Sequence, residues 1–386
     1  MRILMILDHE FPPDIRVENE IESLIEDGHE IHIACYTRED RELKETIGNL
    51  TIHRKRISKF IYKTSVGTLK FPFYFNFWRT FLLDLFKTEH FDAIHIHDLP
   101  LAKVGFEFAN KYKCKFVIDL HENWPALLSV AIHAQSLLGK LLSSNKQWEK
   151  YELTYCKKAD NIIVVVEEAK NRLVSLGINP EKISIVSNTL NFNHFEQPVT
   201  KPDKNYYTLL YAGGINKHRG LQYVIKGLKS LQNTSNSIRL WILGTGSYVD
   251  TLKELTKSEG VDHMVEFMGW KNYTEMQSYF GQADVCLIPH VKNKHTDSTI
   301  PHKLFQYMFA GKPCIASNCT PIKRIIEETN CGLIYEFDNP VDFAKKVLLL
   351  ESSPKLYNEF KENGIKAVKS AYTWEIDKMV LNKVYE

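Results

Sequence analysis

Short apolar runs alternate with longer amphipathic segments from one end of the chain to the other. Residues 2–7 (RILMIL), 161–166 (NIIVVV) and 284–289 (DVCLIP) are such runs, whereas residues 16–26 and 219–231 have helical spacing. Apolar runs that are bounded by polar turns and separated by helices are typical of parallel strands buried on both faces. The alternation therefore predicts an α/β fold with doubly wound parallel sheets.

The length of the chain, 386 residues, exceeds what one hydrophobic core usually supports, so we expect two domains. Between Ser187 and Tyr206 the alternation lapses into a stretch rich in Asn and Pro, which is typical of a linker. We predict two facing Rossmann-like domains, 1–190 and 206–370, joined by a linker over 191–205. A C-terminal helix over 371–386 is expected to cross back to the N-terminal domain. The carboxyl ends of both sheets would border one cleft, where open α/β sheets bind ligands.

The composition excludes several classes of protein. Hydrophobic residues make up 44% and charged residues 25%, as in ordinary soluble globular proteins, and the net charge of +2 argues against nucleic acid as a partner. Seven scattered cysteines without a C-x-x-C pair indicate free thiols in a reducing compartment. The apolar residues 1–7 are too short for a signal peptide core, and no run approaches the ~20 apolar residues of a membrane span. We expect a cytoplasmic protein.

Two glycine-containing turns follow predicted strands in the second half. In YAGGINKHRGL, Gly213 and Gly214 let the backbone approach a ligand, and Arg219 before the next helix offers a fork of donors for phosphate oxygens. By itself, the segment favours the simpler interpretation that the glycines only turn the chain. The second turn, ILGTGSYVDTL, has Gly244 and Gly246 but lacks the third glycine of the dinucleotide fingerprint, which disfavours a nicotinamide-dependent oxidoreductase. A serine hydrolase is disfavoured because no G-x-S-x-G elbow is present.

The order of the motifs is more specific than any one of them. YAGGINKHRGL, LWILGTGS, VEFMGW, ADVCLIPH and PHKLFQYMFAGKPCIAS follow one another in the second half, and the first half contains DAIHIHDLPLA and KFVIDLHENWP. In this order, the whole chain resembles the retaining glycosyltransferases of family 4, which have the GT-B fold. The resemblance implies a nucleotide-diphosphate sugar on the C-terminal domain, with a UDP-sugar favoured, and a glycan or lipid-linked acceptor on the N-terminal domain. It implies neither a cofactor nor a metal ion.

The resemblance also implies a donor site in the second half. Arg219 corresponds to the basic residue that holds the diphosphate, but the arginine that many relatives have after the first glycine is here Gly214. Lys303 is expected to add charge at the phosphates, and Gly269 and Trp270 in FMGWKNY are expected near the base. The predicted nucleotide and diphosphate contacts are Gly213, Gly214, Arg219, Gly244, Gly269, Trp270, Lys303 and Gln306.

Both glutamates of the family's E-x(7)-E pattern are replaced in this sequence. Gln306 stands where the second glutamate binds the ribose, and a neutral amide makes weaker bonds than a carboxylate, so we expect ribose affinity to fall roughly tenfold at most. Ser298 stands at the first position, and we assign Asp297, Ser298 and Thr299 to the donor sugar or acceptor. Without the resemblance, Lys303 and Gln306 would be interpreted as solvated positions on a helix. The replacements leave open an alternative, a GT-B protein that binds a nucleotide or glycan without catalysis.

On the N-terminal side, the resemblance places a histidine after a buried strand, and His121 in VIDLHENWP corresponds to it. We therefore expect His121, with Arg219 and Lys303, to take part in catalysis. The other predicted contacts to donor sugar or acceptor in this half are Arg16, His97, Asp98 and Glu122. For Arg16, an ordinary ion pair near a helix cap is an equally good interpretation. His95 and His97 project from one face of a strand, but a buried strand explains them as well, and we expect no metal.

Basic residues interleave with aromatic ones over residues 54–86 (RKRISKFIYKTSVGTLKFPFYFNFWRTFLLDLF). Such a segment can contact an anionic membrane surface, which would place the protein at the inner face of the membrane and suit a lipid-linked acceptor. A helix over residues 69–85 that buries its aromatic side chains as core is an equally good interpretation. Single-stranded nucleic acid also binds such segments, but the balanced net charge argues against it.

Overall fold

The computed structural model describes residues 1–130, 144–195, 205–232 and 237–386. The chain folds into two compact units. The first unit contains Met1–Ser187 and Glu375–Glu386, and the second unit contains Asn188–Trp374. In the described ranges, no helix is long and apolar enough to cross a membrane.

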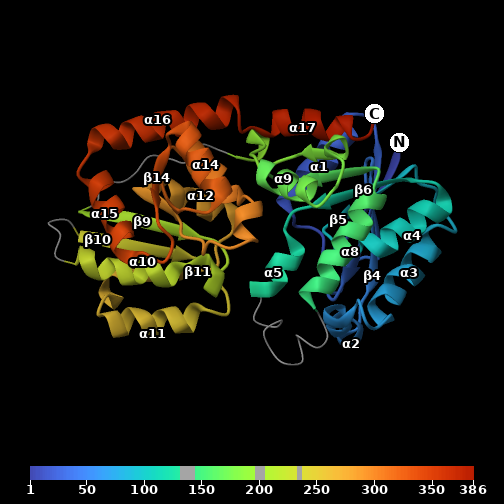
Figure 1. Cartoon of the computed structure of the whole chain (residues 1–386), viewed down its shortest axis with the longest axis horizontal. Coiled ribbons are helices and arrows are strands. Elements are labelled where there is room, and N and C mark those ends of the chain that lie inside the picture. The colour runs from blue at the N-terminus through green and yellow to red at the C-terminus, as the bar shows by residue number, and fades with distance from the viewer. Residues whose placement is uncertain (131–143, 196–204, 233–236) are drawn as a thin grey trace. The chain divides into compact units, whose positions relative to one another are not determined.

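The first unit is built on an eight-stranded sheet with the order β3-β4-β2-β1-β5-β6-β7-β8. All neighbours are parallel except the β3–β4 hairpin. The strands are β1 (Arg2–Leu7), β2 (Glu30–Thr37), β3 (Lys44–Ile47), β4 (Leu50–Arg56), β5 (Ala93–His97), β6 (Lys115–Leu120), β7 (Asn161–Val164) and β8 (Ile183–Ile185). The helices are α1 (Ile15–Glu26), α2 (Lys59–Lys63), α3 (Phe73–Leu85), α4 (Ala102–Tyr112), α5 (Trp124–Val130), α8 (Asn145–Lys158) and α9 (Glu167–Ser175). Figure 1 shows these helices packed around the sheet.

The second unit has a six-stranded sheet, entirely parallel, with the order β11-β10-β9-β12-β13-β14. The strands are β9 (Tyr206–Ala212), β10 (Ser237–Leu243), β11 (Val265–Gly269), β12 (Val285–Ile288), β13 (Cys314–Ser317) and β14 (Gly332–Tyr335). The helices are α10 (Leu221–Leu228), α11 (Val249–Glu259), α12 (Tyr273–Gln282), α13 (His302–Phe309), α14 (Thr320–Thr329), α15 (Pro340–Glu351) and α16 (Pro354–Ser370). This is the Rossmann strand order, which reverses direction between β9 and β12. The first sheet reverses in the same way between β1 and β5. Ligands of open α/β sheets bind outside the carboxyl ends of the strands at such a point.

The boundaries of the units differ from the predicted ones at the linker. The second unit begins at Asn188, and within residues 191–195 it already contains a short 3-10 helix, Phe192–His194, followed by the buried Phe195. The rest of the predicted linker, residues 196–204, lies outside the described residues. The last helix, α17 (Trp374–Lys383), leads the chain back to the first unit, where Tyr385 is buried and its hydroxyl lies 2.6 Å from His95 Nδ1.

Four of the ten aromatic side chains of the segment 54–86 belong to the core. Tyr74, Phe75, Trp78 and Phe81 lie on the buried face of α3. For these four residues the core interpretation is correct and the membrane interpretation is wrong. The exposed aromatic residues of the segment lie on α2, in the turn before α3 and at Phe73, the first residue of α3.

Candidate functional site

Gly213, Gly244 and Gly269 lie at the carboxyl ends of β9, β10 and β11. Gly244 has φ 128°, and a Cβ placed on it would lie 2.0 Å from the carbonyl oxygen of Gly213. The amide of Gly244 donates to the carbonyl of Gly269 at 2.7 Å, and the amide of Gly213 donates to Leu243 at 3.0 Å. The three strand-end turns therefore pack directly against one another. This packing by itself requires glycine at position 244, independently of any ligand contact.

Gly220, in the segment YAGGINKHRGL, is not among the predicted site residues. It has φ 76°, precedes α10, and a Cβ on it would lie 1.6 Å from the carbonyl oxygen of Pro289, which follows β12. The backbone beside Arg219 is thus pressed against the end of β12. As a result, Arg219 lies at the point where the strand order of the second sheet reverses.

The guanidinium of Arg219 contacts a buried histidine. Its Nη1 lies 3.1 Å from Nε2 of His290, a residue that is only 3% exposed. Burial, together with the charges of Arg219 and Lys303, lowers the pKa of His290 well below its usual value, so the ring is neutral and Nε2 can accept. Arg219 Nε is buried and has no hydrogen-bond partner among the residues that the structure describes. Burial and the charge of Arg219 also lower the pKa values of His218 and His295 to about 4, so these neighbours add no charge.

Lys303, near the start of α13, lies at the end of β9. Its Nζ donates to the carbonyl of Ala212 at 2.6 Å and lies 4.2 Å from the centre of the Tyr211 ring. A Cβ on Gly213 would lie 2.6 Å from Nζ, so the side chain fills the space that this glycine leaves. Burial and the charge of Arg219 lower the pKa of Lys303. Over the described ranges, no carboxylate lies within ion-pair distance of Arg219 or Lys303.

Gln306 lies three residues after Lys303 on α13, so the two side chains share one face of the helix. Gln306 is 8% exposed, and the interpretation of this position as solvated is therefore wrong. Trp270, after β11, is 71% exposed, and the space around Gly269 is open. A Cβ on Gly214 would lie 3.7 Å from Asn216 Nδ2, an ordinary contact, and the Gly214 carbonyl accepts a hydrogen bond from the Tyr211 hydroxyl at 2.8 Å.

In the first unit, an acidic residue joins the carboxyl end of β6 to α1. Asp119 is fully buried on β6, and Arg16 of α1 reaches it with two nitrogens, Nη2 to Oδ1 at 2.9 Å and Nε to Oδ2 at 3.1 Å. Arg16 Nε also lies 3.1 Å from Glu20 Oε1, and Nη1 donates to the carbonyl of Val186 at 3.0 Å. The guanidinium is 4% exposed and bound within its own unit, which favours the alternative of an ion pair, and a contact of Arg16 with donor or acceptor stays a prediction.

His121 lies just after β6, beside the same carboxylate. Its Nε2 is 2.8 Å from Asp119 Oδ2, and its Nδ1 is 3.6 Å from Asp98 Oδ2. Burial opposes protonation, but the charges of Asp119 and Asp98 outweigh it and raise the pKa of His121 to about 9. His97, predicted at the mouth of a cleft, is instead 2% exposed, with Nδ1 3.6 Å from Asp119. The structure thus brings His97, Asp98 and His121 together.

The comparisons with known proteins agree with both halves of the chain. A model described as Glycosyltransferase Family 4 matches residues 15–193, and a model described as Glycosyl transferases group 1 matches residues 193–367. The chain belongs to the family 4 glycosyltransferases. It is accordingly an enzyme that transfers a sugar.

Relatives of this glycosyltransferase are distant in sequence. An uncharacterised glycosyltransferase of Methanocaldococcus jannaschii is 23% identical, over 97% of this chain and 95% of its own length. A putative colanic acid biosynthesis glycosyltransferase, WcaL of Salmonella typhimurium, is 23% identical over 46% of this chain and 44% of its own. Sucrose-phosphate synthase from Thermosynechococcus elongatus has a TM-score of 0.82 at 15% identity, over 100% of this chain and 98% of its own. HepE of Anabaena, in complex with UDP, has a TM-score of 0.74 at 12% identity, over 100% of this chain and 99% of its own. These structures confirm the predicted GT-B fold.

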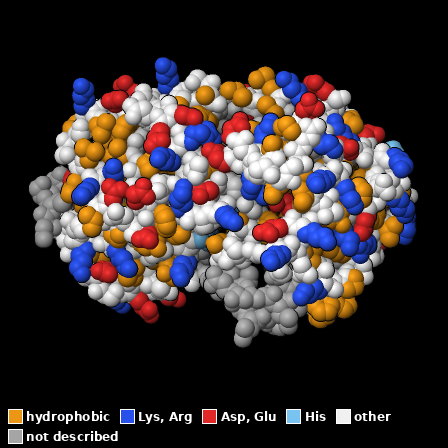
Figure 2. Space-filling model, viewed as in Figure 1, with side chains coloured by type: hydrophobic (Ala, Val, Ile, Leu, Met, Phe, Trp, Pro, Cys, Tyr) orange, Lys and Arg blue, Asp and Glu red, His pale blue; other side chains and the backbone are white. Residues whose placement is uncertain are grey.

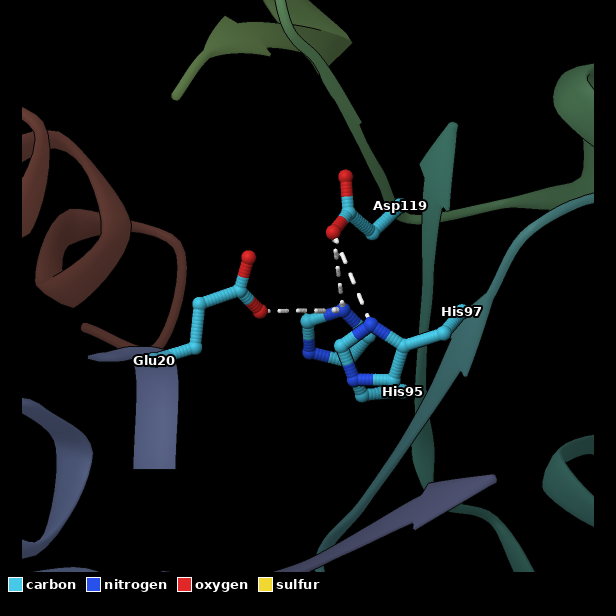
Figure 3. A group of neighbouring side chains, drawn as sticks. All are labelled: Glu20, His95, His97 and Asp119. Atoms are coloured by element: carbon cyan, nitrogen blue, oxygen red, sulfur yellow. Dashed lines mark ion pairs between the residues drawn. The ribbon is translucent and has the colours of Figure 1, made fainter. Parts of the chain in front are cut away.

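Four side chains of the glycosyltransferase have the chemistry of metal ligands: Glu20, His95, His97 and Asp119 (Figure 3). Their ligand atoms lie within 4.8 Å of one another, but a guanidinium already occupies this place, because Arg16 binds both carboxylates. Burial, followed by the charge of Asp119, raises the pKa of Glu20 well above its usual value. The cluster is therefore best described as a buried ion-pair network around Arg16.

The loop before α13 is tied into the second unit of the enzyme. Asp297 Oδ1 accepts from the amide and hydroxyl of Thr320 at 2.7 and 2.9 Å, which fixes the start of α14. Ser298 is 4% exposed, and its hydroxyl donates to the carbonyl of Lys294 at 2.6 Å. These bonds hold Asp297 to the start of α14 and Ser298 to the loop, and the contacts of both residues with donor or acceptor stay predictions. Thr299 continues the chain in extended conformation.

Two acidic residues at the carboxyl edge of the first sheet were missed. Asp119 was hidden because a charged residue inside an apolar strand gives no periodic signal, although it stands two residues before His121. Asp8 follows β1 and accepts a hydrogen bond from the Tyr74 hydroxyl. Burial is the main cause that raises the pKa of Asp8 to about 7. Glu122, which was predicted, lies beside His121 and is partly buried.

Proposed function

We propose that this enzyme is a retaining glycosyltransferase that takes its sugar from a nucleotide diphosphate, with UDP favoured. The observation that carries the proposal is the pair of cations Arg219 and Lys303, which lie at the switch point of the second sheet without a carboxylate partner among the residues described. A buried arginine nitrogen without an acceptor fits an anionic ligand. The structure of HepE in complex with UDP, which has the same fold, supports the choice of nucleotide.

The charges define what these residues do during transfer. As the bond from the sugar to the diphosphate breaks, the ring gains oxocarbenium character and negative charge grows on the phosphate oxygens. Arg219 and Lys303 stabilise this charge, and neutral His290 holds the Arg219 guanidinium from the side. In the retaining reaction, the acceptor hydroxyl attacks on the face from which the diphosphate leaves, and a diphosphate oxygen takes its proton. We propose no metal ion for this step.

We propose a glycan or lipid-linked acceptor, used in the synthesis of a surface polysaccharide or glycoconjugate. The relative WcaL supports this class, because its name assigns it to colanic acid biosynthesis. The acceptor would bind to the first unit, beside His121, Asp98 and Glu122.

Titration calorimetry with UDP, GDP and ADP tests the donor class. We expect UDP to bind tightest, and Arg219→Met and Lys303→Met each to weaken binding by about 10- to 100-fold, since a charge-assisted hydrogen bond contributes about 1.5–3 kcal/mol. Lys226→Met, on the exposed face of α10, is the matched control and should bind as the wild type does. Equal affinities of all four proteins would overturn the donor site. Transfer is then measured from a panel of UDP-sugars.

A second function follows from Ser298, whose hydroxyl is bonded to the loop at the place where relatives have a glutamate. In that case, the chain binds a nucleotide or glycan without catalysis. Tight binding of UDP without turnover of any donor in the panel would favour this alternative, whereas turnover would exclude it.

We further propose that the first unit contacts an anionic membrane at the inner face, through a smaller surface than the sequence indicated. Phe60 is 66% exposed, and Phe71 and Phe73 are each 47% exposed. The neighbouring lysines Lys59, Lys63 and Lys70 are exposed as well. Figure 2 shows hydrophobic side chains next to basic ones over α2, at the lower right. Lysines attract anionic headgroups while aromatic rings enter the interface.

Vesicle flotation tests the membrane contact. The wild type should float with vesicles that contain anionic phospholipid and stay at the bottom with neutral phosphatidylcholine vesicles. A variant with Phe60→Ser and Phe73→Ser should lose most of the binding, whereas Leu349→Ser, an exposed apolar residue on the second unit, should keep it. Absence of wild-type binding to anionic vesicles would overturn this part of the proposal.

A further inference from the structure

Both ring nitrogens of His121 face carboxylates. Nε2 lies 2.8 Å from Asp119 Oδ2 on one side, and Nδ1 lies 3.6 Å from Asp98 Oδ2 on the other. A neutral imidazole carries one N–H and could satisfy only one of these two carboxylates as a donor. An imidazolium has two N–H groups and a positive charge, so the geometry favours the cation at this position.

Asp98 is held in place by an unusual backbone conformation. Its φ is 63°, in the left-handed region, and its amide donates to the carbonyl of Asp119 at 2.8 Å. Its Oδ1 accepts from the backbone amide of His121 at 3.2 Å, which leaves Oδ2 toward the ring. Aspartate and asparagine tolerate this conformation better than most residues. This conformation therefore lets the Asp98 carboxylate contact His121 twice, with Oδ1 at the backbone amide and Oδ2 at the ring.

The other charged groups around His121 do not cancel the preference of its ring for the positively charged form. Arg16 from α1 neutralises part of the charge of Asp119, and Asp14 at the start of α1 adds a further negative charge. Burial lowers the pKa values of His97 and His95 on β5, so these rings are neutral, and Glu20 of α1 is shifted toward its neutral form by burial. The carboxylates of Asp98, Asp119 and Asp14 thus outweigh the single cation Arg16 near His121.

We propose that His121 is a permanent imidazolium, that Asp98 and Asp119 are its positioning residues, and that it acts on the bound substrate as a fixed positive charge. In this role, His121 neither takes a proton from the acceptor hydroxyl nor gives one to the leaving group. Its side chain is 16% exposed, so a substrate can approach the part of the ring that the carboxylates leave open. The inference deepens the proposed function and rests on it for the identity of the substrate.

The first experiment measures protonation directly and does not depend on activity. The chain is labelled with carbon-13 and nitrogen-15 in histidine, the His121 signals are assigned by comparison with His121→Asn, and the ring is titrated by NMR. In the wild type, we expect a pKa above 8, in keeping with the value of about 9 that the two carboxylates impose. A wild-type pKa of 6.5 or lower would overturn the proposal, whether or not any variant folds.

Asp98→Asn is the variant that tests the positioning role. Asparagine has nearly the same shape, accepts the left-handed φ and keeps an oxygen for the backbone amide of His121, so only the charge is lost. We expect the pKa of His121 to fall by about one unit or more, as an opposite charge at this range shifts it by about 1–3 units. Asp84→Asn, on the exposed side of α3, is the control and should leave the titration unchanged. An unchanged His121 titration in Asp98→Asn would remove Asp98 from the proposal.

The dependence of the transfer rate on pH distinguishes a fixed cation at His121 from a general base. A fixed cation predicts a rate that is flat near neutral pH and falls as His121 loses its proton, at a lower pH in Asp98→Asn than in the wild type. A general base predicts the opposite, a rate that rises through the same pKa, and this result would overturn the proposal. UDP affinity, measured by calorimetry on the same samples, tests the donor site separately, so failure of the proposed function is distinguishable from failure of this inference.

Discussion

Replacement of Arg16 by methionine should destabilise the first unit far more than the loss of a surface ion pair would. Methionine keeps the apolar part of the side chain but removes the guanidinium, which is 4% exposed. The change leaves Asp119, which is fully buried, without its bidentate partner, and it also removes the contact to Glu20 and the donor to the Val186 carbonyl. A buried carboxylate without compensation is the costly outcome.

The magnitude follows from the burial of the pair. Breaking a buried ion pair by removing one partner costs about 3–5 kcal/mol. For a domain of 150–250 residues, 1 kcal/mol corresponds to about 2–4 °C in the melting temperature, so the first unit should melt roughly 6–20 °C lower. Protonation of Glu20, whose pKa burial already raises, relieves part of the excess negative charge and favours the lower half of this range.

The matched control is Arg79→Met. Arg79 makes the same bidentate contact with Glu107, at 2.7 and 2.8 Å, but the two side chains are 28% and 36% exposed. Water screens this pair, so its loss should cost at most about 1 kcal/mol. Scanning calorimetry gives both melting temperatures, and hydrogen exchange identifies the transition of the first unit. If Arg16→Met melts no lower than Arg79→Met, the buried network does not stabilise the unit and the reasoning fails.

Three further predictions concern other parts of the chain. Gly220→Ala should destabilise the second unit by more than about 2 kcal/mol in urea unfolding, because its Cβ would meet the Pro289 carbonyl at 1.6 Å. Gly260→Ala, with a similar φ of 72° but open space, should cost only about 1 kcal/mol, and equal costs would contradict the steric cause. All seven cysteines are buried, so a thiol reagent should react slowly with the native protein. After denaturation, all seven thiols should react. Fast reaction of the native protein would contradict this prediction. The folded state raises the pKa of His121, so the stability that its ion pairs contribute should be fully present below about pH 6.5 and should be lost as the pH rises to about 9. We expect the urea midpoint of the wild type to fall over this pH range and that of His121→Asn to fall less. An equal fall in both proteins would contradict this prediction.

The sheets could be predicted from the sequence because buried parallel strands have a strong local signal. Residues 2–7 and 161–164 are apolar runs that form β1 and β7 with almost no exposed side chain. By contrast, β3 was missed, since its four residues, Lys44–Ile47, form an exposed edge strand without an apolar run. The limits of the second unit were predicted less well, because residues 191–195 look like a linker in composition but are packed in the structure.

The sequence indicates which candidate site residues share one helix, but it does not indicate their partners on other elements. The position of Lys303 and Gln306 on one helix face follows from their spacing alone. The bond between Arg16 and Asp119 joins residues 103 positions apart, and neither residue carries a local sign that the other is near. Arg16 was therefore assigned to a ligand, when its charge is used inside the protein.

The charges of the two units suggest how they divide the reaction. In the first unit, Arg16 and His121 each lie beside a carboxylate, Asp119 for both and Asp98 for His121, so neither positive charge needs a phosphate as its counter-ion. In the second unit, Arg219 and Lys303 lie beside histidines that burial keeps neutral, and each cation lowers the pKa of the buried His290. Two basic groups held together without a carboxylate partner among the described residues repel each other when both are charged, and a bound diphosphate would offset that repulsion. These charges support the proposal that the second unit binds the diphosphate and that the first unit binds the uncharged hydroxyl groups of the acceptor.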